Sequence, residues 1–440
     1  LLMFICAVSE VISISAVIPF LALLINPDNP QKFYFINSFF NYFINYEPLF
    51  ISGIILILTN ILTPFLRLYN LKKSGLITSQ IGTELSYLLY KTNINQPYGE
   101  YIKLNSSNLI SAASIDIGRV VQIMSNINNM ITGIFISIFI ISNLLIINSK
   151  IALSSLIIFG SCYFLIGSFT KSRLVRNSKI VTENNVKLVN LIQDIFGSIR
   201  EVILYQYQDV SLKEYISVDK PMRKYGAENI FIASFPKYIL ESAGLIFITL
   251  IAILLSSASS DNSSIFPLLG VFAISAQRLL PALQQIYVGW STVKGYQASL
   301  IKIKKLVLKK IINYEKYQNN QKLLFTKQIS FRNISYRYSI KDEFIFKDLN
   351  FEIFKGEKIG LIGSTGAGKS TLINMAMGFL PPSKGQICID DKLISDISEI
   401  NNLREWQKLI AYVPQNIYLK DGSFIENIAF GIKKEEVNLA

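Results

Sequence analysis

The chain has 440 residues, of which 51% are hydrophobic and only 17% are charged, a balance that is typical of a membrane protein. Its net charge of +13 does not indicate a nucleic-acid-binding protein, because the basic residues mostly flank apolar segments and are not gathered with aromatic residues in one soluble region. The chain has no histidine, which excludes imidazole chemistry, and its three cysteines are too scattered to indicate a disulfide framework or a metal motif.

Six apolar stretches are long enough to cross a bilayer as helices, which requires roughly 20 residues each. They comprise residues 1–25, 49–68, 130–147, 151–169, 235–255 and 265–288, and they place the predicted membrane domain at residues 1–300. The first stretch is too long for the core of a signal peptide, and no cleavage site of small residues follows it. Pro64 and Pro281 lie inside two stretches, where proline is tolerated and often kinks a membrane helix. We therefore expect an all-α bundle of six transmembrane helices.

Loop charges predict how this bundle is oriented, because cytoplasmic loops are enriched in lysine and arginine. Five basic residues lie between the second and third stretches and ten between the fourth and fifth, whereas the opposite loops contain only Lys32 and Lys150. The two long basic loops, which we expect to be mostly helical, should be cytoplasmic, and by parity so should the C-terminal domain.

The loop at residues 26–48 contains eight aromatic residues. Such a loop is typical of an aromatic belt at the outer membrane interface. A second interpretation is a short amphipathic helix on the outer leaflet that contacts a lipid-like substrate.

A phosphate-binding loop follows the predicted basic linker at residues 301–322 and lies within a soluble domain at residues 323–440. Residues 358–362 are predicted to form a short buried strand and residues 372–379 a helix, which is the setting that a P-loop requires. Glycines let successive backbone N–H groups point at one anion, and the start of the helix adds its dipole. The predicted ATP-binding residues of this loop are Gly363, Ser364, Thr365, Gly366, Ala367, Gly368, Lys369, Ser370 and Thr371. Lys369 should reach the β- and γ-phosphates, and Ser370 should bind Mg²⁺.

Three further stretches resemble the ATP-binding domain of ABC transporters. Residues 331–338 resemble its beginning, where an aromatic residue at the place of Tyr338 stacks on adenine, although Tyr338 could instead only end a strand. Residues 412–415 resemble the Q-loop of the family, which implies a catalytic role for Gln415 in contacting Mg²⁺ and the attacking water. Residues 424–431 match the stretch that follows that loop in exporters. The resemblance implies a multi-domain protein, with a type I exporter-like bundle followed by the N-terminal part of an α/β P-loop nucleotide-binding domain.

The signature motif, Walker B carboxylates and switch histidine of the family do not occur in these 440 residues. We therefore expect a domain truncated at its C-terminal end, which acts as an ABC-type ATPase when full length but does not hydrolyse ATP as given. The alternatives from other classes are a truncated membrane subunit that only binds ATP and an ATP-gated channel. The family layout also implies that two copies pair as a homodimer and that the loop tips at residues 98–105 and 206–213 dock on the ATP-binding domain.

Within exporters, four stretches are similar to the bacterial lipid-linked oligosaccharide flippases. They are Ser9-Glu10 with residues 18–20, residues 235–241, residues 277–281 and residues 414–419. The resemblance implies a flippase of the bacterial inner membrane that moves a lipid-linked glycan or related polysaccharide precursor. A multidrug or lipid exporter is the alternative.

Ionisable residues inside the predicted spans give a hypothesis for substrate binding, because a charge within the bilayer is costly unless it has a function or a partner. Glu10 and Arg278 lie near the middle of the first and sixth stretches, and Arg67 and Lys237 lie toward the cytoplasmic side. Arg67, Lys237 and Arg278 would bind a lipid diphosphate through charge-assisted hydrogen bonds. The structural alternative is an internal pair between Arg278 and Glu10 or Glu241 that stabilises the bundle.

Overall fold

The computed structural model describes residues 1–25, 48–102, 105–258, 265–308, 323–395, 400–415, 417–432 and 436–437. The chain forms two compact units, one of residues 1–95 and 104–311 and the other of residues 96–103 and 312–440. The aromatic loop predicted at residues 26–48 lies outside the described residues except for Pro48.

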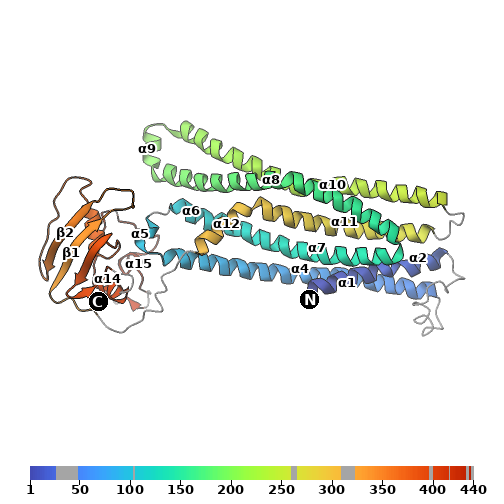
Figure 1. The fold of residues 1–440 in the computed structure, drawn as a ribbon, viewed down its shortest axis with the longest axis horizontal. Coiled ribbons are helices and arrows are strands. Elements are labelled where there is room, and N and C mark those ends of the chain that lie inside the picture. The colour runs from blue at the N-terminus through green and yellow to red at the C-terminus, as the bar shows by residue number, and fades with distance from the viewer. Residues whose placement is uncertain are drawn as a thin grey trace. The chain divides into compact units, whose positions relative to one another are not determined.

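The described part of the first unit consists of helices, several of them long and lying side by side (Figure 1). They are α1 (Leu2–Ser15), α2 (Val17–Ile25), α4 (Pro48–Ile94), α6 (Ser106–Ser111), the π-helical turn η3 (Ala112–Asp116), α7 (Ile117–Ile147), α8 (Ser149–Gly197), α9 (Ile199–Leu204), α10 (Gln208–Ala258), α11 (Ile265–Gly295) and α12 (Gln297–Val307). Each of the six predicted apolar stretches falls within these helices, and the first is divided at Ala16 into α1 and α2.

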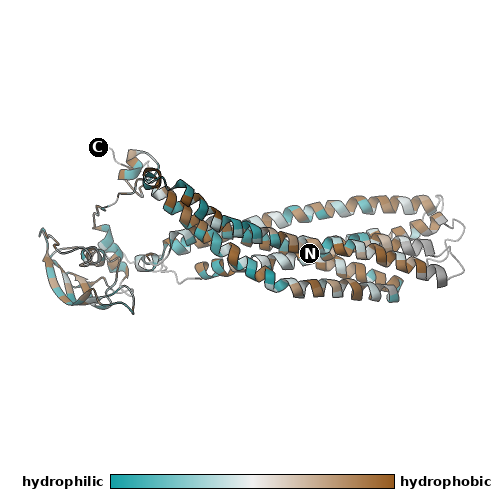
Figure 2. Ribbon diagram, turned by 90° about the horizontal axis from the view of Figure 1, so that it is seen from above, coloured by the Kyte–Doolittle hydropathy of each residue, from teal (hydrophilic) through white to brown (hydrophobic). Residues whose placement is uncertain are grey.

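Five segments of the described chain are long and apolar enough to cross a membrane. They are Leu2–Leu21, Pro48–Ile94, Ser106–Ile147, Ala152–Gly197 and Gln208–Ile253. The sixth predicted stretch is helical as part of α11 but is not among these five segments. α4, α8 and α10 continue far beyond their apolar stretches, so the predicted helical character of the long loops is confirmed. Figure 2 shows hydrophilic residues becoming frequent toward one end of these helices.

The core of the first unit lies between α7 and α11, whose backbones approach closely at two glycines. A Cβ atom at Gly133 would lie 2.6 Å from the carbonyl oxygen of Ala282, and one at Gly289 would lie 2.6 Å from Cβ of Met130. Small residues at such points let two helices pack backbone to backbone. Buried apolar residues surround this seam, among them Ile136, Ile140, Leu144, Val271, Phe272 and Leu279.

The described part of the second unit contains a four-stranded antiparallel sheet in the order β2-β1-β3-β4. The strands are β1 (Gln328–Tyr336), β2 (Phe346–Phe354), β3 (Lys384–Ile389) and β4 (Lys392–Leu393), and the helices are α5 (Tyr98–Tyr101), α13 (Lys369–Ala376), α14 (Ile400–Lys408) and α15 (Phe424–Ile428). Its core includes stacked rings of Phe331 and Phe351, whose centroids are 4.2 Å apart. The indole N–H of Trp406 donates to the carbonyl of Ala376 at 2.8 Å, which ties α14 to α13.

The prediction of a buried strand at residues 358–362 is wrong for the described structure. The segment forms no strand, and Ile359, Leu361 and Ile362 are exposed, the last completely. An apolar run becomes a buried strand only when a neighbouring strand pairs with its backbone and a layer covers its side chains. None of β1 to β4 pairs with this segment.

Residues 301–307, the beginning of the predicted linker, are the second half of α12. Ile303 and Leu306, three residues apart and therefore on one helix face, are buried against Leu89, Ala112 and Val120. This packing explains why a segment with so many lysines is helical and belongs to the first unit.

Candidate functional site

The predicted phosphate loop has the backbone form that its glycines allow. Gly366 and Gly368 have φ angles of +86° and +91°, in the region that residues with a side chain rarely adopt. A Cβ atom at Gly368 would also lie 2.6 Å from Ile345 and 2.7 Å from Phe346. Gly368 is therefore required both by its dihedral angle and by the lack of space around it.

Lys369 closes this loop and begins α13. Its ammonium group donates to the carbonyls of Gly363 at 2.7 Å and Ser364 at 2.8 Å, so the side chain folds back over the loop. Gly368 is the N-cap of α13, whose first N–H groups and positive dipole end are suited to an anion. α13 ends at Ala376, three residues before the predicted end, because Gly378 has a φ angle of +72°.

Tyr338 lies beside the phosphate loop. Its hydroxyl is 2.8 Å from the hydroxyl of Thr371, and its ring meets that of Tyr336 edge to face with centroids 5.3 Å apart. β1 ends at Tyr336, and 48% of Tyr338 is exposed. The structure thus brings this aromatic residue together with the loop, and its stacking on adenine remains a prediction.

The two predicted Mg²⁺ ligands, Ser370 and Gln415, are both exposed. The structure records no contact between them in the described chain, and Gln415 lies in a segment without regular structure. No cluster of three or more histidine, cysteine, aspartate or glutamate side chains that could hold a metal is found among the described residues. The Ser370 hydroxyl and the Gln415 amide carry oxygen ligands of the kind that Mg²⁺ prefers, and binding of Mg²⁺ by these two residues remains a prediction.

The second unit includes a short piece of the first of the two long basic loops. The rings of Tyr98 and Phe379 have centroids 5.1 Å apart, and a Cβ atom at Gly99 would lie 3.6 Å from Leu380. α5 therefore packs against the segment that follows α13, and the predicted docking of the first loop tip is confirmed for Tyr98–Tyr101. The docking of residues 206–213, which belong to the first unit, remains a prediction.

A second candidate site lies among the membrane-type helices, around the fully buried Glu10 of α1. Its carboxylate accepts an ion pair from Arg67 of α4 at 2.5 Å and another from Arg278 of α11. Arg278 also donates to Oδ1 of Asn60 at 2.8 Å and to the hydroxyl of Ser13 at 3.1 Å. Two guanidinium groups share one carboxylate, so the cluster carries a net charge of +1.

This cluster borders a cavity of about 590 Å³ that is lined by Val17, Phe20, Leu21, Leu56, Asn60, Arg67, Ile274, Gln277, Arg278 and Pro281. The predicted substrate residues Arg67 and Arg278 therefore meet at one place. Lys237 does not join them, because it lies on α10, is exposed, and is 3.8 Å from Glu241 of the same helix. The alternative that Arg278 pairs with an internal carboxylate holds for Glu10, whereas Glu241 has Lys237 as its partner.

Asn60 and Ser13, which complete the cluster, were not predicted from the sequence. Asn60 lies seven residues before Arg67 and Ser13 three residues after Glu10, so each polar residue shares a helix face with a charged one. This spacing of polar residues inside apolar runs is the pattern from which their place in the cluster could have been predicted.

Comparison with known proteins supports both halves of this description. Residues 346–439 match the family model described as ABC transporter. A putative ABC transporter ATP-binding protein from Mycoplasma genitalium is 27% identical over 378 residues, which cover 82% of this chain and 58% of that protein. An ATP-dependent lipid A-core flippase from Wigglesworthia glossinidia brevipalpis is 24% identical over 369 residues, or 81% of this chain and 61% of that protein. The chain thus spans about three fifths of the length of these relatives.

The fold is also similar to that of a solved protein. A bacterial Atm1-family ABC exporter with ATP bound superposes with a TM-score of 0.67 over 91% of this chain and 69% of that one, at 13% sequence identity. The similarity shows that this chain has an exporter-like fold, in which a helical, membrane-type region is followed by a nucleotide-binding domain.

Proposed function

We propose that this chain is an exporter-type ABC half-transporter that uses ATP to move an anionic, lipid-linked substrate across the bacterial inner membrane. The observation that carries this proposal is the cluster of Glu10, Arg67 and Arg278 at a cavity between membrane-type helices. A surplus positive charge in such a place is costly unless an anion or water compensates it.

The proposed substrate class follows from the chemistry of that cluster. Guanidinium groups bind phosphate oxygens through paired N–H groups, so two of them beside one cavity suit a diphosphate better than a neutral lipid. The apolar residues of the same cavity suit an acyl or prenyl chain. A lipid-linked oligosaccharide or a related polysaccharide precursor combines both parts. The named flippase relative, which acts on lipid A-core, supports the lipid class.

The proposed energy source is ATP bound at the phosphate loop. On binding, the ammonium of Lys369 would exchange the carbonyls of Gly363 and Ser364 for phosphate oxygens, while the start of α13 offers N–H groups to the same anion. Mg²⁺, held by the Ser370 hydroxyl and by Gln415, would neutralise phosphate charge. Tyr338 would stack on adenine and position the base.

The proposed assembly is a dimer of two copies, with the ATP-binding domain in the cytoplasm. The basic character of the long loops supports this orientation. The packing of α5 within the nucleotide-binding unit supports a role for the first loop in carrying movement from that unit to the membrane helices.

The test is a flipping assay in proteoliposomes, with a fluorescent lipid diphosphate oligosaccharide on one side and a neutral fluorescent lipid as the comparison. Arg278→Ala should lower diphosphate flipping by about tenfold or more, the loss expected when a charge-assisted contact of 1.5–3 kcal/mol is removed. Arg278→Lys should restore part of it, because an ammonium lacks the paired donors. Lys237→Ala is the matched control, since Lys237 lies away from the cavity.

Folded Arg278→Ala protein that flips the diphosphate lipid at the full rate would refute the proposed substrate role. Equal loss for the neutral lipid would favour the alternative function, a multidrug or general lipid exporter.

A further inference from the structure

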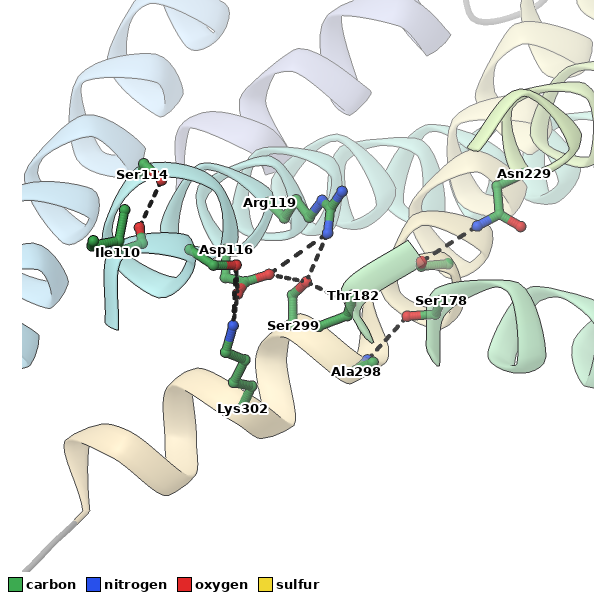
Figure 3. A network of polar contacts seen from close by, with 12 residues as sticks. Ile110, Ser114, Asp116, Arg119, Ser178, Thr182, Asn229, Ala298, Ser299 and Lys302 are labelled. Atoms are coloured by element: carbon green, nitrogen blue, oxygen red, sulfur yellow. Dashed lines mark hydrogen bonds and ion pairs between the residues drawn. The ribbon is translucent and has the colours of Figure 1, made fainter. Parts of the chain in front are cut away.

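A second buried charge cluster lies just beyond the C-terminal end of α11, outside both candidate sites. Asp116, the last residue of η3, is completely buried, and its Oδ2 is 2.7 Å from the ammonium of Lys302 on α12. Its Oδ1 accepts a hydrogen bond from the hydroxyl of Ser299 at 2.6 Å. Figure 3 shows these side chains converging from two separate stretches of helix, with Arg119 on the far side of the carboxylate.

The same cluster fixes the junction between α11 and α12. The helix breaks at Tyr296, and the backbone N–H of Ala298 donates to the hydroxyl of Ser178 on α8 at 3.0 Å. The Ser299 hydroxyl is 3.2 Å from that of Thr182, also on α8. Side chains thus bind groups that the break leaves free, so α12 is held at a defined angle.

A second cation, Arg119, also lies close to the Asp116 carboxylate. Arg119 is 3.6 Å from Oδ1 of Asp116, beyond the length of a hydrogen bond, whereas Lys302 is within that length. If Lys302 moved away, Asp116 would keep a positive partner and would not become an unpaired buried charge. The arrangement can therefore release α12 without the full penalty of breaking a buried pair.

The position of this cluster in the chain suits a mechanical role, because it lies near the points where the chain passes between the two units. The chain passes between the two units at three points, near residues 95, 103 and 311. η3 follows the second of these points by nine residues, and α12 ends shortly before the third. The π-helical form of η3 fits this role, since such turns are frequent at functional sites.

We propose that Asp116 and Lys302 form a releasable latch that joins the two chain segments leading to the nucleotide-binding unit, so that nucleotide binding moves α6, η3 and α12 together. The latch rests on the proposed function, because it assumes that nucleotide binds at the phosphate loop. Asp116 and Lys302 are positioning residues and touch no nucleotide.

The experiment is hydrogen exchange followed by mass spectrometry on the full chain in lipid nanodiscs, with and without Mg²⁺ and a non-hydrolysable ATP analogue. Lys302→Met removes the latch, Lys302→Arg keeps the charge, and Lys304→Met places the same change on the exposed side of α12. In wild-type protein the analogue should slow exchange in residues 363–371 and alter exchange in both 106–116 and 297–307.

In Lys302→Met, protection of residues 363–371 should persist while the response of 297–307 is lost. Without nucleotide, residues 106–116 and 297–307 of this variant should exchange about tenfold faster than in wild-type protein. The reason is that a buried ion pair is broken while Asp116 keeps Arg119 as a partner. Lys302→Arg should restore the response, and Lys304→Met should behave as wild type.

Three results would overturn the latch. They are a wild-type response of 297–307 in Lys302→Met, faster exchange confined to 297–307, and an equal effect of Lys304→Met. If the analogue protects residues 363–371 in no variant, the proposed function fails instead. In that case the existence of the latch is tested by comparing nucleotide-free exchange of its two segments between Lys302→Met and wild-type protein.

Discussion

The cluster around Glu10 predicts an unequal response to the loss of its members. Glu10 is the shared partner of two arginines, and its side chain is only 1% exposed. Glu10→Gln leaves both guanidinium groups without a carboxylate, which costs about 3–5 kcal/mol for a buried pair. Because the Arg67 side chain is 44% exposed and is partly screened by solvent, we expect a loss of about 3 kcal/mol, the lower end of that range.

Arg278→Met should destabilise the protein less than Glu10→Gln. The carboxylate keeps Arg67 as its partner, so the main losses are hydrogen bonds to Asn60 and Ser13. A charged donor in such bonds contributes about 1.5–3 kcal/mol, which gives an expected loss of about 2 kcal/mol. The double variant Glu10→Gln, Arg278→Met should lose less stability than the sum of the two single losses, by about 1–3 kcal/mol, because the two residues interact directly.

Equilibrium unfolding in mixed micelles measures these differences. The chain has two tryptophans, Trp290 on α11 and Trp406 on α14, so a Trp406→Phe background leaves fluorescence that reports on the first unit alone. A larger loss for Arg278→Met than for Glu10→Gln, or strictly additive losses, would contradict the shared-carboxylate geometry.

Three further predictions concern the nucleotide-binding unit. Gly368→Ala should abolish binding of an ATP analogue. Gly356 is the control, because it has a similar φ angle of +88° but open space around it. Gly356→Ala should keep binding and lose only about 1–2 kcal/mol of stability from the left-handed backbone. Lys369→Ala should remove ATP-driven transport in vesicles while membrane insertion, measured by alkali extraction, stays unchanged. Although burial raises the pKa of Asp390, hydrogen bonds from Gln328 and neighbouring backbone lower it to about 2, so its stabilisation is complete above about pH 4 and lost as the pH falls through 2. Asp390→Asn should flatten the dependence of the melting temperature on pH in that window. An unchanged fall of the melting temperature toward low pH would contradict this prediction.

The phosphate loop and the apolar helices could be predicted because their signals are local. Gly366, Gly368 and Lys369 stand at fixed spacing in one short segment, and the dihedral angles at both glycines follow directly from that pattern. Apolar runs of membrane length likewise predict helices without knowledge of their neighbours.

The remaining features depend on partners far along the chain. Asp116 and Lys302 are separated by 186 residues, and no periodicity in either segment indicates that they meet. The buried strand predicted at residues 358–362 failed for the same reason, because burial requires a neighbouring strand that the described chain does not provide. Arg67 and Arg278 could be selected as costly charges, and Glu10 as one possible partner of Arg278, but the pairing of Glu10 with both arginines follows only from the packing of three helices.

The glycine seam between α7 and α11 restricts which motions the bundle can perform. At Gly133 and Gly289 each helix occupies the space where the other would carry a Cβ atom. A shift by one residue along the helix axis would bring a neighbouring side chain into that space, so the two helices are locked in register. We therefore expect α7 and α11 to move as one rigid body, so that relative motion within the first unit occurs between this pair and the other helices.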